Sequence, residues 1–371
     1  MPQFYKWQRE VLMPQFCTTT IRCCLAIVLR HVVMANAYNG SLDSSSVERK
    51  SELYPAFVKE LPSLAGKTVA ITGASRGLGY VTALACAQKG AGVLMLGRKS
   101  EAADKAFDAL QEAAAFSSLS DKCPAPVFVE CDHLDFASVR EAANNIQKIT
   151  EESGLDVLCC NAGIMLQEDF ASKDGYDITI STNVLAHFLI TKELMPTLEK
   201  AEQLRGEARI VSMSSGSGFG PPAFNPVYFT RRGGNLGGER ASYDRYHQSK
   251  LSNLIFTAAL DDRLRANDSN IKAVACTPGV CGTDMFVHAT KVMSGRPAPR
   301  SNVPSTEDGS LAQLKCIFDS DIKSGDLWGP SRGMGGLPAK ADLSPPTVLI
   351  NEEVKAELWK LCEDAVGEFT L

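Results

Sequence analysis

Residues 67–79 of the chain read KTVAITGASRGLG, an apolar run followed by three glycines, Gly73, Gly77 and Gly79. The run KTVAIT is rich in β-branched residues and predicts a buried strand, and residues 77–90 predict a helix directly after it. Glycines between a strand and a helix let the backbone turn tightly and approach a pyrophosphate, whose charge is stabilised by the amino end of the helix. The stretch therefore predicts a dinucleotide site. A second glycine cluster, GGNLGGER at 233–240, has no strand before it and predicts only a flexible loop.

The alternation of strand-like and helical segments continues along the rest of the chain. Short β-branched runs lie at 67–72, 92–96, 126–130, 156–160, 209–213 and 271–276, and helical patterns lie between them at 77–90, 100–116, 136–152, 176–203 and 241–265. This rhythm predicts an α/β fold with a single Rossmann-type, doubly wound parallel sheet and helices on both of its faces. Such sheets bind ligands beyond the carboxyl ends of their strands, so we expect functional residues just after the strands.

The residues after the second predicted strand indicate which dinucleotide binds. A site for NAD normally places an acidic residue there, whereas LGRKS at 96–100 supplies Arg98 and Lys99. Together with Arg76 in the glycine loop, these side chains form a cationic pocket that suits a 2′-phosphate, because an arginine can donate two hydrogen bonds to it. The sequence therefore predicts NADP(H) in preference to NAD(H). The alternative is that these arginines are solvated surface residues.

The stretch ASYDRYHQSKLSN at 241–253 places a tyrosine and a lysine on one face of a predicted helix. Tyr246 and Lys250 are four residues apart, about 6 Å along the axis, whereas Tyr243 is seven residues from the lysine. An ammonium at about 5 Å would favour the phenolate by roughly 3 kcal/mol, or about two pKa units, while burial acts in the opposite direction. Tyr246 is therefore the candidate proton donor to a carbonyl oxygen. An ordinary helix-surface pair is the alternative.

A serine-rich segment follows the fifth predicted strand. SMSSGSG at 212–218 places Ser214 and Ser215 at the carboxyl edge of the sheet, where the nicotinamide end of a dinucleotide is expected. One of these hydroxyls could hold a carbonyl oxygen. The alternative is that the segment is only a loop, because serine is common in loops.

Charge and cysteine content exclude several classes of function. The net charge of −5 over 371 residues leaves no basic excess to bind the phosphates of a nucleic acid. The 12 cysteines form no C-x-x-C motif and the five histidines form no H-E-x-x-H motif. We therefore expect buried free thiols in a reducing compartment and no metal site.

Taken together, the motifs resemble those of the short-chain dehydrogenase/reductase family over about residues 66–366. The matching segments are TGASRGLG at 72–79, CNAG at 160–163, SMSS at 212–215, YHQSK at 246–250 and PGVCGT at 278–283. Two departures are Cys160, where most members have asparagine, and Ala186, where glycine is commoner. These departures put in doubt details of strand-end hydrogen bonding and helix packing but remove no catalytic group.

The resemblance implies a catalytic tetrad. Asn183 would maintain a water-linked proton relay, Ser215 would orient the substrate oxygen, and Tyr246 would be the acid/base. Lys250 would lower the pKa of the tyrosine and hold the nicotinamide ribose. The cofactor-binding residues implied by the family are Gly73, Ser75, Arg76, Gly77, Leu78, Gly79, Arg98, Asp132 at the adenine, Asn161, Ala162, Gly163, Tyr246, Lys250, Pro278, Gly279, and Thr283 at the carboxamide.

Within the family, the chain is similar to the retinol dehydrogenase, WW-domain oxidoreductase and protochlorophyllide reductase group. An inserted loop at 218–240 is expected to shape one wall of the substrate site. Residues 287–306 are placed to act as a lid, with Met285, Phe286, Val287 and Met293 as an apolar lining. The alternative is that these four side chains pack against the domain.

The resulting prediction is an NADP(H)-dependent oxidoreductase that interconverts a lipophilic ketone or aldehyde and its alcohol. Three alternatives stay open. They are light-dependent, protochlorophyllide reductase-like reduction of a C=C bond, a non-catalytic NADP-sensing protein, and a structural partner that docks through 233–240 or through the amphipathic segment 352–369.

The amino-terminal part of the chain differs in composition from the rest. Residues 1–37 are basic, with an apolar run before MANA, and predict a targeting leader or interfacial anchor, the alternative being a disordered extension. Residues 38–64 are expected to be a linker and 65–371 the NADP-binding domain. We expect an endomembrane (endoplasmic reticulum) or organellar location, with a cytoplasmic one as the alternative. Peripheral membrane association through the leader and a homodimer are further expectations.

Overall fold

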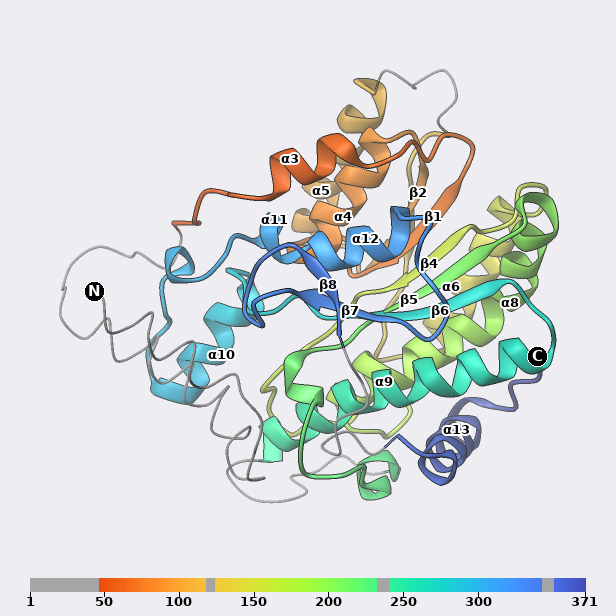
Figure 1. The fold of residues 1–371 in the computed structure, drawn as a ribbon. Helices are drawn as coiled ribbons and strands as arrows, with labels where there is room; N and C mark the ends of the chain where they lie inside the picture. Colours follow the sequence, from red (N-terminus) through yellow and green to blue (C-terminus); the bar gives the residue numbers. More distant parts are fainter. Residues whose placement is uncertain (1–46, 118–123, 232–240, 342–349) are drawn as a thin grey trace.

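The strand predicted at residues 67–72 lies inside an eight-stranded sheet in the computed structural model, which describes residues 47–117, 124–231, 241–341 and 350–371. The strand order is β3-β2-β1-β4-β5-β6-β7-β8, and all neighbours are parallel except the β7–β8 pair (Figure 1). The strands are β1 Thr68–Thr72, β2 Gly92–Gly97, β3 Val127–Glu130, β4 Val157–Cys160, β5 Ala208–Met213, β6 Ile271–Cys276, β7 Leu327–Pro330 and β8 Pro338–Lys340.

The predicted Rossmann-type fold is confirmed, including all six predicted strands. The winding reverses between β1 and β4, which pair directly, and the crevice at this point is where such sheets bind ligands. Strands β7 and β8 were not predicted from the sequence. Both are short, and each contains a proline, which weakens the strand signal.

Helices cover both faces of the sheet and bury its alternating side chains. In β1, Val69 and Ile71 face the layer of α4, α5 and α12, whereas Ala70 faces the layer of α6, α8, α9 and α13 (Figure 1). The bounds of these helices are α4 Gly77–Gln88, α5 Glu101–Ala115, α6 Phe136–Ile149, α8 Ala186–Arg205, α9 Ala241–Ala266, α12 Leu311–Phe318 and α13 Glu352–Val366.

The helix predicted at 176–203 is divided into three parts. A short turn, α7 (Ile178–Ile180), leads into a π-helical stretch, η3 (Ser181–Leu185), and α8 continues from there. The Ala186 N–H donates to the Ser181 carbonyl, five residues back, as a π-helix requires. Such stretches are rare and concentrate at functional sites. This one contains Asn183.

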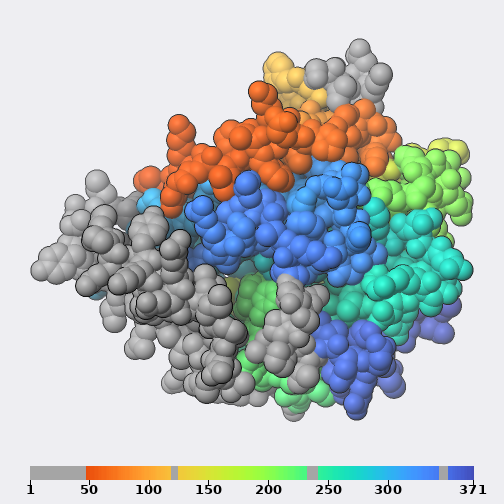
Figure 2. Space-filling model, viewed as in Figure 1, coloured from red at the N-terminus to blue at the C-terminus, as the bar shows by residue number. Residues whose placement is uncertain are grey.

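The linker expected at 38–64 is wrong for its carboxyl-terminal half. Residues 54–60 form helix α3 (Tyr54–Glu60), whose apolar side chains pack against the α4–α5 layer. The Asp308 carboxylate accepts the backbone N–H groups of Leu53 and Tyr54, each at 2.9 Å. Figure 2 shows this segment lying along the carboxyl-terminal third of the chain. The polar composition suggested a linker, and no local pattern revealed the helix, because its partner Asp308 is 254 residues from Tyr54 in sequence.

The amphipathic carboxyl-terminal segment packs within the domain as α13. Leu358, Trp359 and Cys362 are buried against α9 and α8, and the Arg263 guanidinium lies 3.8 Å from the Trp359 ring centroid. Its apolar face is therefore used in the core and is not a free docking surface. The predicted leader at 1–37 and the GGNLGGER loop lie outside the described residues. Within the described ranges, no helix is both long and apolar enough to span a membrane.

Candidate active site

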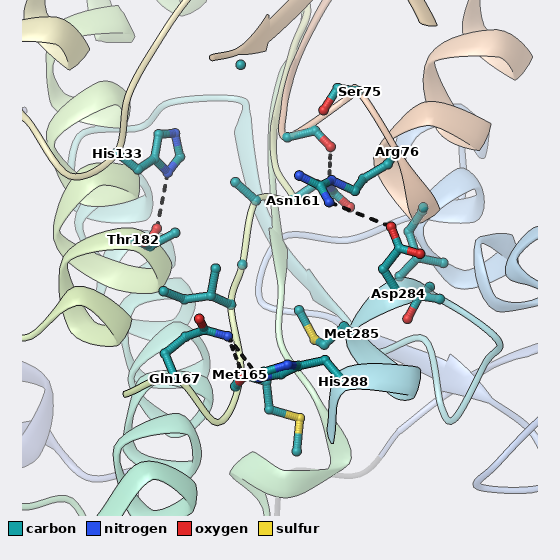
Figure 3. Close-up of a pocket in the computed structure, with 18 of the residues that line it drawn as sticks. Ser75, Arg76, His133, Asn161, Met165, Gln167, Thr182, Asp284, Met285 and His288 are labelled. Atoms are coloured by element: carbon teal, nitrogen blue, oxygen red, sulfur yellow. Dashed lines mark hydrogen bonds and ion pairs between the residues drawn. The ribbon is translucent and has the colours of Figure 1, made fainter. Parts of the chain in front are cut away.

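A cavity of about 670 Å³ opens at the carboxyl ends of the strands (Figure 3). Most of the residues predicted for the site line it. They are Gly73, Ser75, Arg76, Gly77, Leu78, Arg98, Asp132, Asn161, Ala162, Gly163, Ser215, Tyr246, Pro278, Gly279 and Thr283. Three predicted residues, Gly79, Asn183 and Lys250, do not line the cavity and lie behind its wall.

The glycine loop leaves room for a large anion at the start of α4. Gly73 and Gly77 have φ of +66° and +59°, which favour glycine. The N-cap residue of α4, Arg76, makes no side-chain hydrogen bond to the first turn. Gly77 and Leu78 at the helix start line the cavity, where their N–H groups suit a phosphate. The loop and the cavity fit a dinucleotide.

Gly79 is tightly packed and does not line the cavity. A Cβ at this position would lie 2.4 Å from Asn161 Nδ2 and 2.5 Å from the Gly73 carbonyl oxygen. We expect Gly79→Ala to lower the free energy of unfolding by about 1–3 kcal/mol, because neither neighbour can retreat easily. Urea denaturation would measure it. Gly97→Ala is the matched control, since a Cβ there has nothing within 4 Å, and an equal loss in both variants would contradict the packing argument.

The ends of β1 and β4 are joined by the Thr72 hydroxyl. The backbone N–H groups of Asn161 and Ala162 both donate to Thr72 Oγ1 at 2.9 Å. Asn161 Nδ2 also donates to the Thr72 carbonyl at 2.9 Å. Cys160, one of the two departures from the family pattern, is buried, with its sulfur 3.8 Å from Thr191 Oγ1. The strand-end hydrogen bonds thus do not depend on an asparagine at 160.

Tyr246 and Ser215 come together at the wall of the cavity. The Tyr246 hydroxyl is 4.0 Å from the Met285 sulfur, and the residue is 5% exposed, so the phenol is covered by α10 (Asp284–Ser294). Ser215 Oγ accepts the Ser217 N–H at 3.3 Å, which leaves the Ser215 proton to be donated elsewhere. Both groups can therefore meet one ligand oxygen.

Lys250 and Asn183 support this wall from behind. Lys250 Nζ donates to the Met213 carbonyl at 2.9 Å and lies 5.8 Å from the Tyr246 ring centroid. The Asn183 amide accepts the Ile164 N–H at 2.9 Å and donates to the Ile164 carbonyl at 3.0 Å and to Ser249 Oγ at 2.9 Å. A Cβ on Gly163 would be 3.4 Å from both Asn183 Oδ1 and Lys250 Nζ. Gly163 therefore lies next to both groups.

The Tyr246 phenol does not have the lowered pKa that was expected from its neighbour Lys250. Burial raises the pKa of the Tyr246 phenol to about 12, and hydrogen bonding with Ser215 offsets only part of that. Burial also lowers the pKa of the Lys250 ammonium to about 8. Lys250 Nζ donates to the Met213 carbonyl and lies over the ring, so desolvation of the phenol outweighs the attraction of the ammonium for the phenolate.

The cationic residues predicted for a 2′-phosphate differ in their surroundings. Arg98 is exposed at the cavity and makes no ion pair with any residue in the described ranges. Arg76 lies 3.7 Å from the Asp284 carboxylate across the cavity (Figure 3). Lys99 points away, with Nζ 2.9 Å from Glu130 Oε2. Arg98 is thus the side chain best placed to accept a new anion.

The end of the cavity beside α10 is largely apolar. Met285 and Phe286 line it as predicted, but Val287 packs with Ala298 and Val303, and Met293 is 41% exposed. Those last two predictions are wrong because a helix presents only part of its surface to one cavity. The other apolar lining residues at this end are Ile164, Met165, Ile178 and Ala289.

The sequence analysis missed Gln167 and His288 in this lining. Gln167 Nε2 donates to the Met165 carbonyl at 2.9 Å and lies 3.2 Å from His288 Nε2 (Figure 3). They join α10 to the segment after β4. The only sequence signal for Gln167 was its position in the segment that follows a strand. The only sequence signal for His288 was its position one helical turn from Asp284.

The inserted loop does not form a cavity wall in its described part. Residues 218–231 contribute nothing to the lining and are tied to α9 by Gln248, which donates to the Ala223 carbonyl at 3.0 Å and accepts the Asn225 N–H at 2.9 Å. Residues 232–240 lie outside the described ranges. The expected substrate wall is therefore not found in residues 218–231.

Clusters of metal-ligating side chains and the state of the cysteines can be followed in the described part of the chain. Among the described residues, no three His, Cys, Asp or Glu side chains gather in a group that could hold a metal ion. The cysteines in the described ranges are free and buried, as predicted. Burial raises the pKa of Cys131 and Cys281, which line the cavity, to about 12, so these thiols keep their protons at neutral pH.

Comparisons with known proteins relate the chain to dehydrogenases and reductases. The family model described as short chain dehydrogenase matches residues 67–237. An uncharacterised oxidoreductase from Schizosaccharomyces pombe is 37% identical over 61% of this chain and 63% of its own length, so the chain spans less than two thirds of that relative. Retinol dehydrogenase 14 from Mus musculus is 30% identical over 81% of this chain and 86% of its own. The NADPH-bound carbonyl reductase from chicken fatty liver superposes with a TM-score of 0.52 and 25% identity, covering 75% of this chain and all of that one.

Proposed function

The chain belongs to the short-chain dehydrogenase/reductase family, in its retinol dehydrogenase-like group, and we propose that it uses NADPH to reduce a lipophilic ketone or aldehyde to the alcohol. The observation that carries the proposal is the meeting of Tyr246 and Ser215 in the wall of a cavity that begins at the glycine loop. The relatives named for retinol and carbonyl substrates support the same class of reaction.

The residues on the cavity wall suit NADPH. The glycine loop at 73–79 and the start of α4 would hold the pyrophosphate, Asp132 and Arg98 the adenosine end, and Thr283 the carboxamide. The NADPH-bound relative supports the phosphorylated cofactor. When bound, NADPH supplies the hydride for the carbonyl carbon.

The protein's own groups handle the substrate oxygen and its proton. Ser215 donates a hydrogen bond to the carbonyl oxygen and Tyr246 Oη transfers its proton to that oxygen as negative charge develops. Lys250 Nζ, as an ammonium, favours the phenolate that is left, and Asn183 holds Ile164 and Ser249 so that this wall keeps its shape. The apolar side chains of Met165, Met285 and their neighbours exclude water from the reacting atoms.

The state of the phenol suits carbonyl reduction. Because burial raises the pKa of Tyr246 to about 12, the phenol keeps its proton at neutral pH. A protonated tyrosine is ready to donate to a carbonyl, whereas alcohol oxidation requires the phenolate. The net direction is set by the concentrations of the cofactor and substrate forms, and an excess of NADPH over its oxidised form would drive reduction.

The test is to incubate the protein with NADPH and each member of a panel of lipophilic aldehydes and ketones in the dark. Loss of NADPH absorbance measures the reaction. We expect turnover with at least one long-chain or ring-containing carbonyl and little with short polar ones. If no carbonyl is reduced although NADPH binds, the protein is a sensor and the proposal fails. If turnover needs illumination, C=C reduction of the protochlorophyllide type replaces it.

Arg98 is expected to set the preference for NADPH. Arg98→Ala should raise the KM for NADPH about tenfold or more and leave the KM for NADH unchanged, because one charge-assisted hydrogen bond to the 2′-phosphate is lost. Lys99→Ala is the matched control, since that neighbouring charge is paired with Glu130. Steady-state kinetics with both cofactors measures the effect. An equal change for NADH would place Arg98 elsewhere than at the 2′-phosphate.

A further inference from the structure

His187 lies under the cavity wall and makes two hydrogen bonds with its ring. It is 3% exposed on α8 and does not line the cavity. Its Nε2 is 2.9 Å from Thr72 Oγ1, and its Nδ1 is 3.1 Å from the Asn183 carbonyl oxygen. The ring is thus placed between the residue that joins the strand ends and the asparagine of the predicted tetrad.

The hydrogen-bond partners fix where each proton lies. A carbonyl oxygen only accepts, so His187 Nδ1 carries the proton and donates to Asn183. Thr72 Oγ1 already accepts two N–H groups, from Asn161 and Ala162, so its own proton is donated to His187 Nε2. A donation to the Cys159 carbonyl at 3.3 Å would leave the buried Nε2 without a donor. Burial holds the pKa of the imidazole well below its ordinary value, so the ring stays neutral as this pattern requires.

These bonds close a ring of contacts around residues 161–164. Thr72 holds one end of the segment through the N–H groups of Asn161 and Ala162. The Asn183 side chain holds the other end through both backbone groups of Ile164. His187 connects Thr72 to Asn183 through its two ring nitrogens. Asn183 lies in the π-helical stretch, where the backbone hydrogen bonds are shifted by one residue. The segment includes Asn161, Ala162 and Gly163 of the cavity wall.

We propose that His187 is a positioning residue that couples the Thr72 hydroxyl to the Asn183 backbone and thereby fixes residues 161–164 against the cofactor. The inference rests on the proposed function for its link to NADPH, but the coupling itself lies within this chain. A change at His187 should therefore loosen the segment and weaken NADPH binding, although the ring contacts neither cofactor nor substrate.

The experiment compares His187→Phe, which keeps a ring and loses both hydrogen bonds, with Thr197→Val as a matched control. Thr197 is also buried on α8 and its hydroxyl is paired with Thr150 at 2.7 Å, away from the cavity. Two quantities are measured on the full chain. One is amide hydrogen exchange of residues 161–164 without cofactor, and the other is the NADPH dissociation constant from tryptophan fluorescence quenching.

In His187→Phe, we expect the amide exchange rate at 161–164 and the NADPH dissociation constant each to rise about tenfold. In Thr197→Val, we expect each quantity to rise less than about twofold. Where a carbonyl substrate is known, kcat should fall with KM for that substrate unchanged. His187→Gln, which can donate and accept, should restore part of each effect. A purely structural histidine would instead lower the melting temperature alone.

Thr72→Val removes the hydroxyl that pairs with His187 and so tests the same set of hydrogen bonds from the other side. It should reproduce the His187→Phe changes, and the double variant should be no worse than the stronger single one, because both remove one coupled unit. If His187→Phe does not fold, Thr72→Val and His187→Gln carry the same comparison. Exchange rates at 161–164 that match the Thr197→Val control would overturn the proposal. This outcome is distinct from a failure of carbonyl reduction, because hydrogen exchange needs neither substrate nor cofactor.

Discussion

Replacing Tyr246 with phenylalanine is expected to lower kcat for carbonyl reduction by about 10³-fold, with the NADPH dissociation constant unchanged. The variant removes one oxygen from a buried ring and keeps its packing against Met165, Leu166 and Ala289. Only the proton donor at the cavity wall is lost. Single-turnover oxidation of bound NADPH by an aldehyde, followed by absorbance, measures the chemical step without the contribution of product release.

Tyr243→Phe is the matched control for this experiment. Tyr243 lies one helical turn before Tyr246 on α9 and packs against the same small cluster, but it does not line the cavity. It should retain activity within about threefold, as expected for a change outside the reacting atoms. A Tyr246→Phe enzyme with more than a tenth of wild-type kcat would remove the phenol from the proposed mechanism.

The fold was predictable because its signals are local. The strand at 68–72, the glycine loop and the helix from Gly77 are specified by neighbouring residues, and the same holds for each later strand–helix unit. Strand β7 and helix α3 were missed for the opposite reason. The LWGP strand gains its pairing from β6 and β8, and α3 gains its stability from Asp308 and the α4–α5 layer.

The residues of the site could be predicted from the sequence, but the pKa of Tyr246 could not. Strand-end position located Ser215, helical spacing located Tyr246, and the family resemblance located Asn161 and Thr283. Spacing alone could not give the pKa of the phenol, because that depends on the depth of burial and on where Lys250 Nζ points.

His187 was missed for a related reason. A lone histidine in the predicted helix 176–203 carries no motif signal. Its partner Thr72 is 115 residues away in sequence, and only the packed structure brings the two side chains together.

Lys250→Met is expected to lower kcat/KM for carbonyl reduction about 100-fold at pH 7 and to remove its pH dependence between pH 7 and 9.5. Because burial lowers the pKa of Lys250 to about 8, the wild-type ammonium is present below pH 8 and is lost as the pH rises through that value. Tyr246 does not titrate in this range, since its pKa is raised to about 12. The wild-type profile should therefore be level at low pH and fall above about pH 8, with Lys250 as the cause.

Lys250→Arg separates the charge of this side chain from its shape. A guanidinium keeps its proton throughout the range, so the variant should lose the fall above pH 8 even though the bulkier group lowers the overall rate. Stopped-flow kinetics at saturating NADPH, in buffers of constant ionic strength, measures the three profiles. If the wild-type profile falls above pH 8 and Lys250→Met shows the same fall, the titrating group is not Lys250. The ammonium would then have no part in stabilising the phenolate that Tyr246 becomes.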